Sequence, residues 1–267
     1  MRPAVLVAAM EVALKSSVQA FGVAESTSTS LVMLPGLFAG DWIWSAAATL
    51  LAEAGQHCLV LRDAYAERKA HIDDPFGALV DDLLETLDQH ALSSVFLAGN
   101  SVGGVVALEA ARRHPERIAG LLLSGVPGLG GPARLGIRPK LRYTREDALE
   151  VARRLCVNHD LVTDEVVTRC LAPFQQTRTI VNIARYVLAL ETYDSEHAVR
   201  RLACPTLFVW GGQDQVTPVE RLRALPAVWN SLCTIDGCGH SPMFECPALY
   251  GDAVLRFVDV HSPAQTV

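Results

Sequence analysis

The residue run 99–104, Gly-Asn-Ser-Val-Gly-Gly, constrains this chain of 267 residues more than any other feature. It follows a short apolar run at 94–98 and precedes a segment with helical periodicity from Val105 to Arg113. Gly-x-Ser-x-Gly in that setting predicts a sharp strand-to-helix turn with Ser101 at its tip. Its glycines let the backbone turn and let neighbouring elements approach closely. The positive end of the following helix would stabilise a negatively charged oxygen at the same point.

Two later segments place a carboxylate and an imidazole after apolar runs of the same kind. Residues 206–210 lead through a glycine turn to Asp214, and residues 232–235 lead through a second glycine turn to His240. The carboxyl ends of parallel strands lie at one edge of a sheet, so Ser101, Asp214 and His240 should meet there. Taken singly, the three are explained by a glycine-rich turn, a helix-capping carboxylate and a helix-entry histidine. Their joint occurrence favours catalysis.

The order serine, aspartate, histidine resembles the α/β-hydrolase superfamily, over about residues 31–260. A further segment beginning Pro35-Gly36-Leu37 is similar to the oxyanion loop of that superfamily, which usually reads His-Gly. The resemblance implies that the backbone N–H groups of Leu37 and Val102 form an oxyanion hole. Backbone donors do not depend on the missing histidine side chain. The glycine and tryptophan pattern after this loop is similar to small plant-type methylesterases and hydroxynitrile lyases.

These residue types match the needs of nucleophilic catalysis. His240 would take the hydroxyl proton of Ser101, and Asp214 would fix the imidazole tautomer. We therefore expect a serine hydrolase that cleaves a carboxylic ester or thioester of a small or medium apolar acyl compound through an acyl-enzyme on Ser101. No metal or organic cofactor is expected. The expected substrate contacts are Phe38, Trp42, Ser241 and Met243.

Other functions are compatible with the same motifs, because one scaffold supports several reactions. The sequence Gly-Asn-Ser-x-Gly-Gly also occurs in ring-cleavage-product hydrolases, so a carbon–carbon bond hydrolase is the first alternative. A lyase or a cofactor-free oxygenase would be revealed by product analysis. A ligand receptor with residual hydrolase activity would show slow turnover and ligand-dependent partner binding, but the complete triad argues against lost catalysis.

Alternating apolar runs and helical segments predict an α/β fold with a mostly parallel, doubly wound sheet. The chain is 50% hydrophobic, and its length suits one large α/β domain with an insertion. Strands are expected at 31–35, 57–62, 94–98, 118–124, 205–210 and 231–236. Helices are expected at 43–55, 76–91, 102–113, 218–224 and 247–260.

The alternation stops between residues 126 and 201, where helical segments are expected at 144–158, 163–171, 176–191 and 195–201. Thr144 and Asp147 would cap the first of them. The resemblance implies that this interval is a helical cap over the pocket, inserted into a core formed by residues 1–125 and 202–267. A cap excludes water and sets substrate choice.

Charge separates the cap from the rest of the chain. The whole chain has a net charge of −6, which does not favour nucleic acid as a partner, whereas residues 126–201 hold twelve basic and nine acidic residues. An ordinary solvated face is the favoured explanation of the basic cap, and an anionic substrate or an acyl carrier that binds there is the alternative. Arg178 and Arg185 share a helix face and are candidates for a substrate carboxylate. The basic cluster is Arg134, Arg138, Lys140, Arg142 and Arg145.

The seven cysteines are scattered, and the chain has no Cys-x-x-Cys pair, which predicts neither a disulfide framework nor a zinc site. Cys238 and Cys246 flank His240, so a redox role there is an alternative to simple packing. Reduced thiols favour the cytoplasm. No segment has the length of a membrane span, so no membrane partner is expected. Residues 1–17 suit an amphipathic helix, and residues 18–23 look strand-like.

Overall fold

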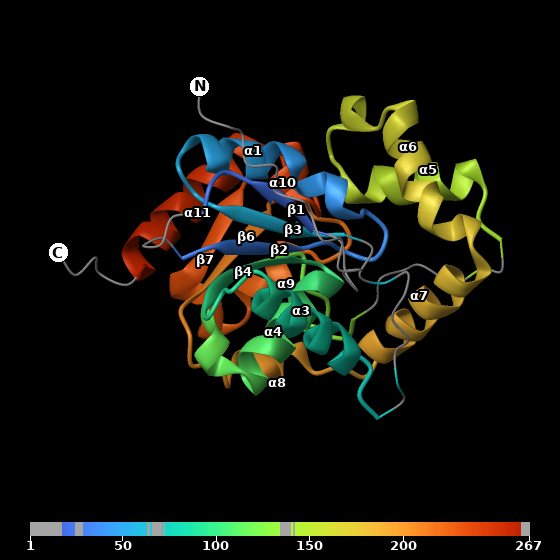
Figure 1. The fold of residues 1–267 in the computed structure, drawn as a ribbon. Coiled ribbons are helices and arrows are strands. Elements are labelled where there is room, and N and C mark those ends of the chain that lie inside the picture. Colours follow the sequence, from blue (N-terminus) through green and yellow to red (C-terminus); the bar gives the residue numbers. More distant parts are fainter. Residues whose placement is uncertain are drawn as a thin grey trace, which may run out of the picture.

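The computed structural model describes residues 18–24, 29–62, 65, 71, 73–133, 140 and 142–262 (Figure 1). In this part of the chain seven strands form one sheet in the order β1-β3-β2-β4-β5-β6-β7. All neighbouring pairs are parallel except β1 and β3. The strands are β1 (Val18–Phe21), β2 (Leu31–Leu34), β3 (Cys58–Leu61), β4 (Val95–Asn100), β5 (Ile118–Ser124), β6 (Thr206–Gly211) and β7 (Leu232–Ile235).

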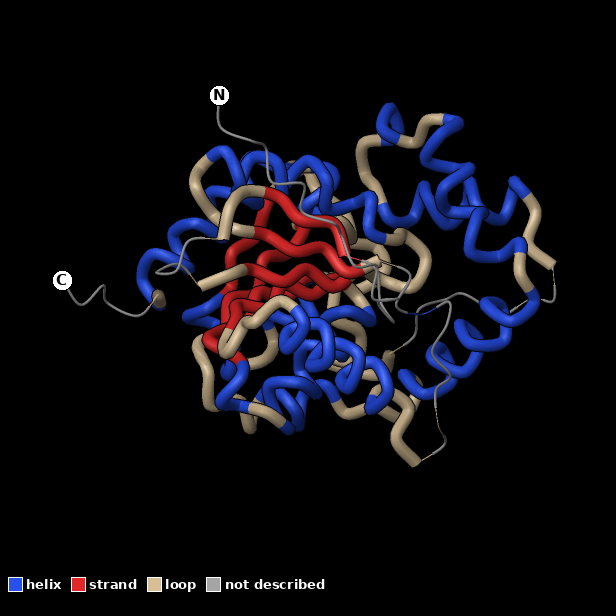
Figure 2. Tube along the Cα trace, in the orientation of Figure 1, coloured by secondary structure: helices blue, strands red, loops and turns tan. Residues whose placement is uncertain are grey.

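The predicted α/β class with a mostly parallel sheet is confirmed. The central strands β2, β3 and β4 are buried at every position, because helices cover both faces of a parallel sheet. Figure 2 shows these two helical layers. One layer contains α1 (Ser45–Glu53), α10 (Pro242–Glu245) and α11 (Pro247–His261), and the other contains α3 (Gly77–Gln89), α4 (Val102–Arg113) and α9 (Val219–Arg223).

The helices expected from the sequence are present, most with bounds that differ by one to three residues, and two differences affect the region near the site. The helix expected from residue 43 begins as a 3-10 turn, Asp41–Trp44, before α1 starts at Ser45. The short helix α10 was not predicted, because its four residues, Pro-Met-Phe-Glu, are too few to show a period. This helix begins two residues after His240 and ends at Glu245.

The interval between β5 and β6 contains α5 (Arg145–Leu155), α6 (Asp164–Leu171), α7 (Thr177–Leu190) and α8 (Ser195–Val199). The first three lie to one side of the sheet in Figure 1, whereas α8 lies beside α4 of the core. We call α5, α6 and α7 with their connections the cap. The Thr144 hydroxyl accepts a hydrogen bond from Asp147 N–H, and Thr144 N–H donates to the Asp147 carboxylate, which is the expected capping box.

A buried carboxylate connects helix α4, which follows Ser101, to its surroundings. Glu109, 5% exposed, accepts hydrogen bonds from Arg112, Arg113 and the Tyr193 hydroxyl. Arg113 also donates to Asp74, whose carboxylate accepts from Gly77 N–H at the start of α3. Burial raises the pKa of Glu109, but the hydrogen bonds from Arg112, Tyr193 and Arg113 outweigh it and hold that pKa below its ordinary value.

Replacing Glu109 with glutamine is expected to lower the free energy of unfolding by about 1.5–3 kcal/mol at pH 7, because Arg112 and Arg113 lose a charged acceptor, although Arg113 keeps its bonds to Asp74. The lowered pKa means that the stabilisation is present above about pH 4.3, the unfolded-state value, and is lost as the pH falls through the folded-state value. Urea unfolding at pH 7 and pH 3.5 measures both effects, with Glu116→Gln, a change at an exposed side chain, as the control. Equal stability of wild type and Glu109→Gln at pH 7 would contradict this expectation.

Candidate active site

Ser101 occupies the turn between β4 and α4 in a strained backbone conformation. Its φ is 55° and its ψ is −121°, a region that side-chain-bearing residues rarely adopt. The Ser101 N–H donates to the carbonyl of Ser124 on β5 at 2.8 Å. A Cβ on Gly99 would lie 2.6 Å from the carbonyl oxygen of Gly103, so only glycine lets strand and helix approach this closely. The turn therefore holds Ser101 at the end of β4.

The turn after β6 brings Asp214 against His240. His240 Nδ1 lies 2.9 Å from Asp214 Oδ2, and the two side chains are 2% and 1% exposed. The other carboxylate oxygen accepts from the N–H groups of Val216 and Thr217 at 2.8 and 2.9 Å. Burial raises the pKa of Asp214, but the charge and hydrogen bonds of His240 and Thr217 outweigh it and hold that pKa below its ordinary value. An ionised Asp214 makes Nδ1 the protonated nitrogen and leaves Nε2 as an acceptor.

Three contacts hold the segment 236–241 between β7 and α10, which we call the His240 loop. The Asn100 amide donates to the His240 carbonyl at 3.0 Å, and the His240 N–H donates to the carbonyl of Leu155 at 2.9 Å. Gly125 lies against the imidazole, where a Cβ would be 2.7 Å from Nδ1. The first contact comes from Asn100 at the end of β4 and the second from cap helix α5, so both the core and the cap contact the segment that carries His240.

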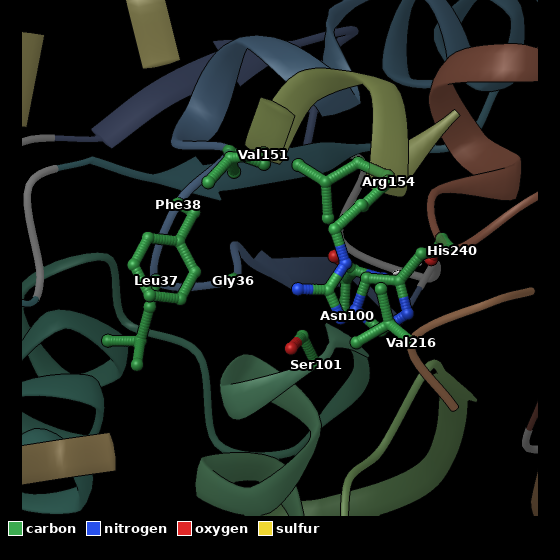
Figure 3. Close-up of a pocket in the computed structure, with 11 residues that line it drawn as sticks. Gly36, Leu37, Phe38, Asn100, Ser101, Val151, Arg154, Val216 and His240 are labelled. Carbon is green, nitrogen blue, oxygen red and sulfur yellow. Dashed lines mark hydrogen bonds between the residues drawn. The ribbon is translucent and has the colours of Figure 1, made fainter. Parts of the chain in front are cut away.

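Ser101 and His240 line one small cavity of about 20 Å³. Figure 3 shows Leu37 and Phe38 on one side of Ser101 and His240 on the other. The volume accommodates about one water molecule. Val151, Arg154 and Leu155 of α5 form part of its wall, and Phe38 stacks on Phe174 of the cap with ring centroids 5.7 Å apart. Its lining is Gly36, Leu37, Phe38, Ala39, Asn100, Ser101, Val151, Arg154, Leu155, Val216 and His240.

The arginine at this cavity is Arg154 of α5, which the sequence pattern did not single out. Its side chain extends from α5 toward Ser101 and Asn100 (Figure 3). The two arginines named from the sequence lie on α7, where Arg178 is exposed and Arg185 is half-buried. Arg154 follows Arg153 on α5, and no sequence signal tells which of two adjacent arginines faces inward, because that depends on how the helix packs.

The remaining expected site residues divide between the cavity and the core. Leu37 lies on the cavity wall, and Val102 is the first residue of α4, directly after Ser101. Phe38 also lies on the wall. The other three expected substrate contacts, Trp42, Ser241 and Met243, are not among the residues that line this cavity.

Packing explains the position of those three residues. Trp42 packs edge-on against Phe244, with ring centroids 5.1 Å apart, and faces a separate cavity beside Arg62 and Arg169. Ser241 and Met243 are 1% and 0% exposed, because α10 turns them into the core. Ser241 and Met243 therefore follow His240 closely in the sequence but do not line the cavity.

Tyr65 is a buried residue that the sequence pattern did not reveal. Its hydroxyl donates to the carbonyl of Pro35 at 2.5 Å, and its ring packs edge-on against Tyr186 of α7 at 5.8 Å. Burial raises the pKa of this phenol. Tyr65 thus supports the loop that carries Leu37 and links that loop to the cap.

Cys238 and Cys246 form a disulfide across the His240 loop, with Cα atoms 6.6 Å apart. The expectation that all seven cysteines are reduced is wrong for this pair, because α10 folds the chain back and brings two residues eight positions apart together. Cys58, Cys156, Cys170, Cys204 and Cys233 are free. The cytoplasmic location stays a prediction.

The expectations about metals, membranes and the basic cluster can be compared with the residues that the structure describes. No cluster of three or more His, Cys, Asp or Glu side chains that could hold a metal occurs among the described residues, and none of their helices is long and apolar enough to cross a membrane. Lys140 pairs with Asp147, and Arg145 pairs with Asp164 at 2.5 Å. The expected helix at 1–17 and two members of the basic cluster, Arg134 and Arg138, lie outside the described residues. A carrier or anionic partner at this face stays a prediction.

The sequence is similar to those of several known hydrolases. The chain is 29% identical over 247 residues to 2-hydroxymuconate semialdehyde hydrolase of Pseudomonas sp. (strain CF600), covering 85% of this chain and 86% of that protein. It is 26% identical over 190 residues to 2-hydroxy-6-oxo-6-phenylhexa-2,4-dienoate hydrolase of Burkholderia cepacia, covering 64% of this chain and 65% of that protein.

Solved structures show the same fold. An esterase from Thermogutta terrifontis superimposes with a TM-score of 0.68 at 21% identity, covering 93% of this chain and 94% of that one. A variant of the meta-cleavage product hydrolase from Pseudomonas fluorescens IP01 superimposes with a TM-score of 0.71 at 19% identity, covering 92% and 94%. The family model for the alpha/beta hydrolase family matches residues 31–253. The chain is therefore a member of the alpha/beta hydrolase family.

Proposed function

We propose that this hydrolase cleaves a carboxylic ester or thioester through an acyl-enzyme on Ser101. The observation that carries the proposal is the buried Asp214–His240 pair at 2.9 Å, whose imidazole lines the same cavity as the strained Ser101. A serine hydroxyl needs such a base, because it is a weak nucleophile at neutral pH.

In the first half of the reaction, Ser101 Oγ attacks the substrate carbonyl carbon while His240 Nε2 takes the hydroxyl proton. The carbonyl oxygen becomes an oxyanion, which the N–H groups of Leu37 and Val102 would stabilise. Each such donor is worth about 3–4 kcal/mol in the transition state. The carbon–oxygen or carbon–sulfur bond then breaks, and His240 returns its proton to the leaving alcohol or thiol.

In the second half, a water molecule attacks the acyl carbon and His240 takes one of its protons. The ester bond to Ser101 breaks, the acid leaves, and the proton returns to the serine oxygen. The ionised Asp214 stabilises the imidazolium in both halves. Closure of the cap over the cavity keeps bulk water out, which strengthens these charge interactions.

A carbon–carbon bond hydrolase is the second candidate, and Arg154 is the observation that favours it. The relatives from Pseudomonas and Burkholderia carry the names of hydrolases for a semialdehyde and a dienoate. A guanidinium beside Ser101 would bind the carboxylate of such a substrate. A carbon leaving group departs as a carbanion, which a nearby positive charge stabilises in the transition state.

A substrate panel separates the two candidates. It contains p-nitrophenyl esters of increasing chain length, their thioester analogues, and 2-hydroxy-6-oxo-6-phenylhexa-2,4-dienoate. Faster turnover of the esters by kcat/KM supports the first candidate, and faster loss of the dienoate chromophore supports the second. If wild type turns over neither class and a fluorophosphonate does not label it, the serine hydrolase proposal fails.

Replacing Arg154 with leucine is expected to discriminate between anionic and neutral substrates. Loss of a charge-assisted hydrogen bond worth about 1.5–3 kcal/mol would lower kcat/KM for the dienoate about 10- to 100-fold. The value for p-nitrophenyl acetate, which has no carboxylate, should change less than threefold. Arg153→Leu, at the exposed neighbour, is the matched control. Equal losses on both substrates would contradict a carboxylate-binding role.

A further inference from the structure

Glu245 joins the His240 loop to the cap through three backbone hydrogen bonds. Its Oε1 accepts from Gly239 N–H at 2.7 Å, one residue before His240. Its Oε2 accepts from Val157 and Asn158 N–H at 2.7 and 3.1 Å, directly after helix α5. One carboxylate therefore bonds on one side to the loop that carries the imidazole and on the other to the end of the cap helix that carries Arg154.

Packing at the same place reinforces this connection. A Cβ on Gly239 would lie 2.9 Å from Glu245 Oε1 and 3.0 Å from the carbonyl oxygen of Leu155, so the loop and the cap are in close contact. One residue before Glu245, Phe244 packs against a small apolar cluster between α5 and α6. That cluster consists of Ala148, Ala152, Val166, Val167 and Cys170.

The size of the cavity shows why such a connection matters. A volume of about 20 Å³ accommodates a water molecule and not an ester, so part of the cavity wall must move for substrate to enter, and Val151, Arg154 and Leu155 of α5 form one side of that wall. When α5 moves, Glu245 loses its contacts with Val157 and Asn158, and the His240 N–H loses the carbonyl of Leu155. The support of the catalytic histidine thus changes with the position of the cap.

We propose that Glu245 is a positioning residue that makes the placement of His240 depend on cap closure. The proposal rests on the catalytic role proposed for Ser101 and His240. With the cap seated, the carboxylate and the Leu155 carbonyl hold His240 at its Asp214 partner. With the cap open, the loop has fewer contacts and the base is less well placed, so proton transfer is tied to the enclosed state.

The test uses Glu245→Ala and Glu245→Gln in the full-length protein. Alanine removes both sets of contacts. Glutamine has one carbonyl oxygen, so it can accept from Gly239 or from Val157 and Asn158, but not from both. Its NH₂ group then faces the N–H donors on the other side. We expect fluorophosphonate labelling of Ser101 to slow about 10- to 100-fold in the alanine variant and by a smaller factor in the glutamine variant, since small misplacements carry such costs. The kcat on p-nitrophenyl acetate, calculated from the concentration of active sites that a separate fluorophosphonate titration gives, should fall in parallel, with little change in KM. Glu220→Ala, at an exposed position on α9, is the control and should match wild type.

Hydrogen exchange gives a readout that does not depend on activity. Peptides covering 152–158 and 237–245 should both exchange faster in Glu245→Ala, because the cap end and the His240 loop lose their shared partner. A folded alanine variant with wild-type labelling and exchange would overturn the proposal. If that variant does not fold, wild-type labelling and exchange by Glu245→Gln would overturn it. A wild type that shows no labelling or turnover would instead refute the proposed function, and exchange would still report whether the two segments are coupled.

Discussion

Replacing Ser101 with alanine is expected to lower kcat about 10⁶-fold, to the residual rate left by binding and the oxyanion donors. The reason is local: Ser101 is the hydroxyl that the β4–α4 turn places at the cavity shared with His240. Steady-state turnover of the preferred ester, measured at protein concentrations high enough to detect the residual rate, checks the expectation.

The control for this variant is Ser93→Ala, which removes an exposed hydroxyl just before β4 and should behave as wild type. Ser101→Ala should also remain folded, because alanine deletes one oxygen atom and leaves the Gly99 and Gly103 contacts in place. Retention of more than about one hundredth of wild-type kcat by a folded Ser101→Ala protein would rule out Ser101 as the nucleophile.

Replacing Asp214 with asparagine is expected to lower kcat about 10⁴-fold, an effect that follows from the hydrogen bonds around the carboxylate. Val216 and Thr217 donate their N–H groups to Asp214 Oδ1, so an asparagine in this place would keep its carbonyl oxygen there. Its NH₂ group would then face His240 Nδ1, which lies 2.9 Å from Oδ2 in the wild type.

An amide donor at that position reverses the imidazole tautomer. Nδ1 becomes the acceptor and Nε2 carries the proton, so His240 cannot accept the proton of Ser101. The fluorophosphonate labelling rate and kcat should fall together. Thr217→Val is the comparison, because it removes only the hydroxyl that donates to Asp214 Oδ2 at 2.6 Å and leaves the acid in place. A loss of less than tenfold in Asp214→Asn would show that Asp214 does not set the tautomer.

The core of the fold could be predicted from sequence because its signals are local. Buried parallel strands read as short apolar runs, and the glycine turns after β4, β6 and β7 marked where each strand ended. Because the carboxyl ends of parallel strands lie at one edge of a sheet, Ser101, Asp214 and His240 could be predicted to lie near one another, although the distances between them could not. The capping box at Thr144 was readable for the same reason, since its partners are three residues apart.

The contacts that sequence patterns did not reveal join distant segments. Tyr65 meets Pro35, Arg154 reaches the cavity from the cap, and Glu245 spans 88 residues to Val157. No period or motif specifies these pairings, which arise when separate elements pack. The Cys238–Cys246 disulfide was missed for a related reason, because the cysteine count argued against a framework and could not show one local crosslink.

The most direct test of Ser101 as the nucleophile is the site of covalent modification. Wild-type protein is treated with a fluorophosphonate, its intact mass is measured, and the modified peptide is sequenced by tandem mass spectrometry. We expect a single adduct on Ser101, absent from Ser101→Ala and formed far more slowly in Asp214→Asn. An adduct on another residue, or ester turnover by wild type with no adduct at Ser101, would contradict the assigned role of this serine.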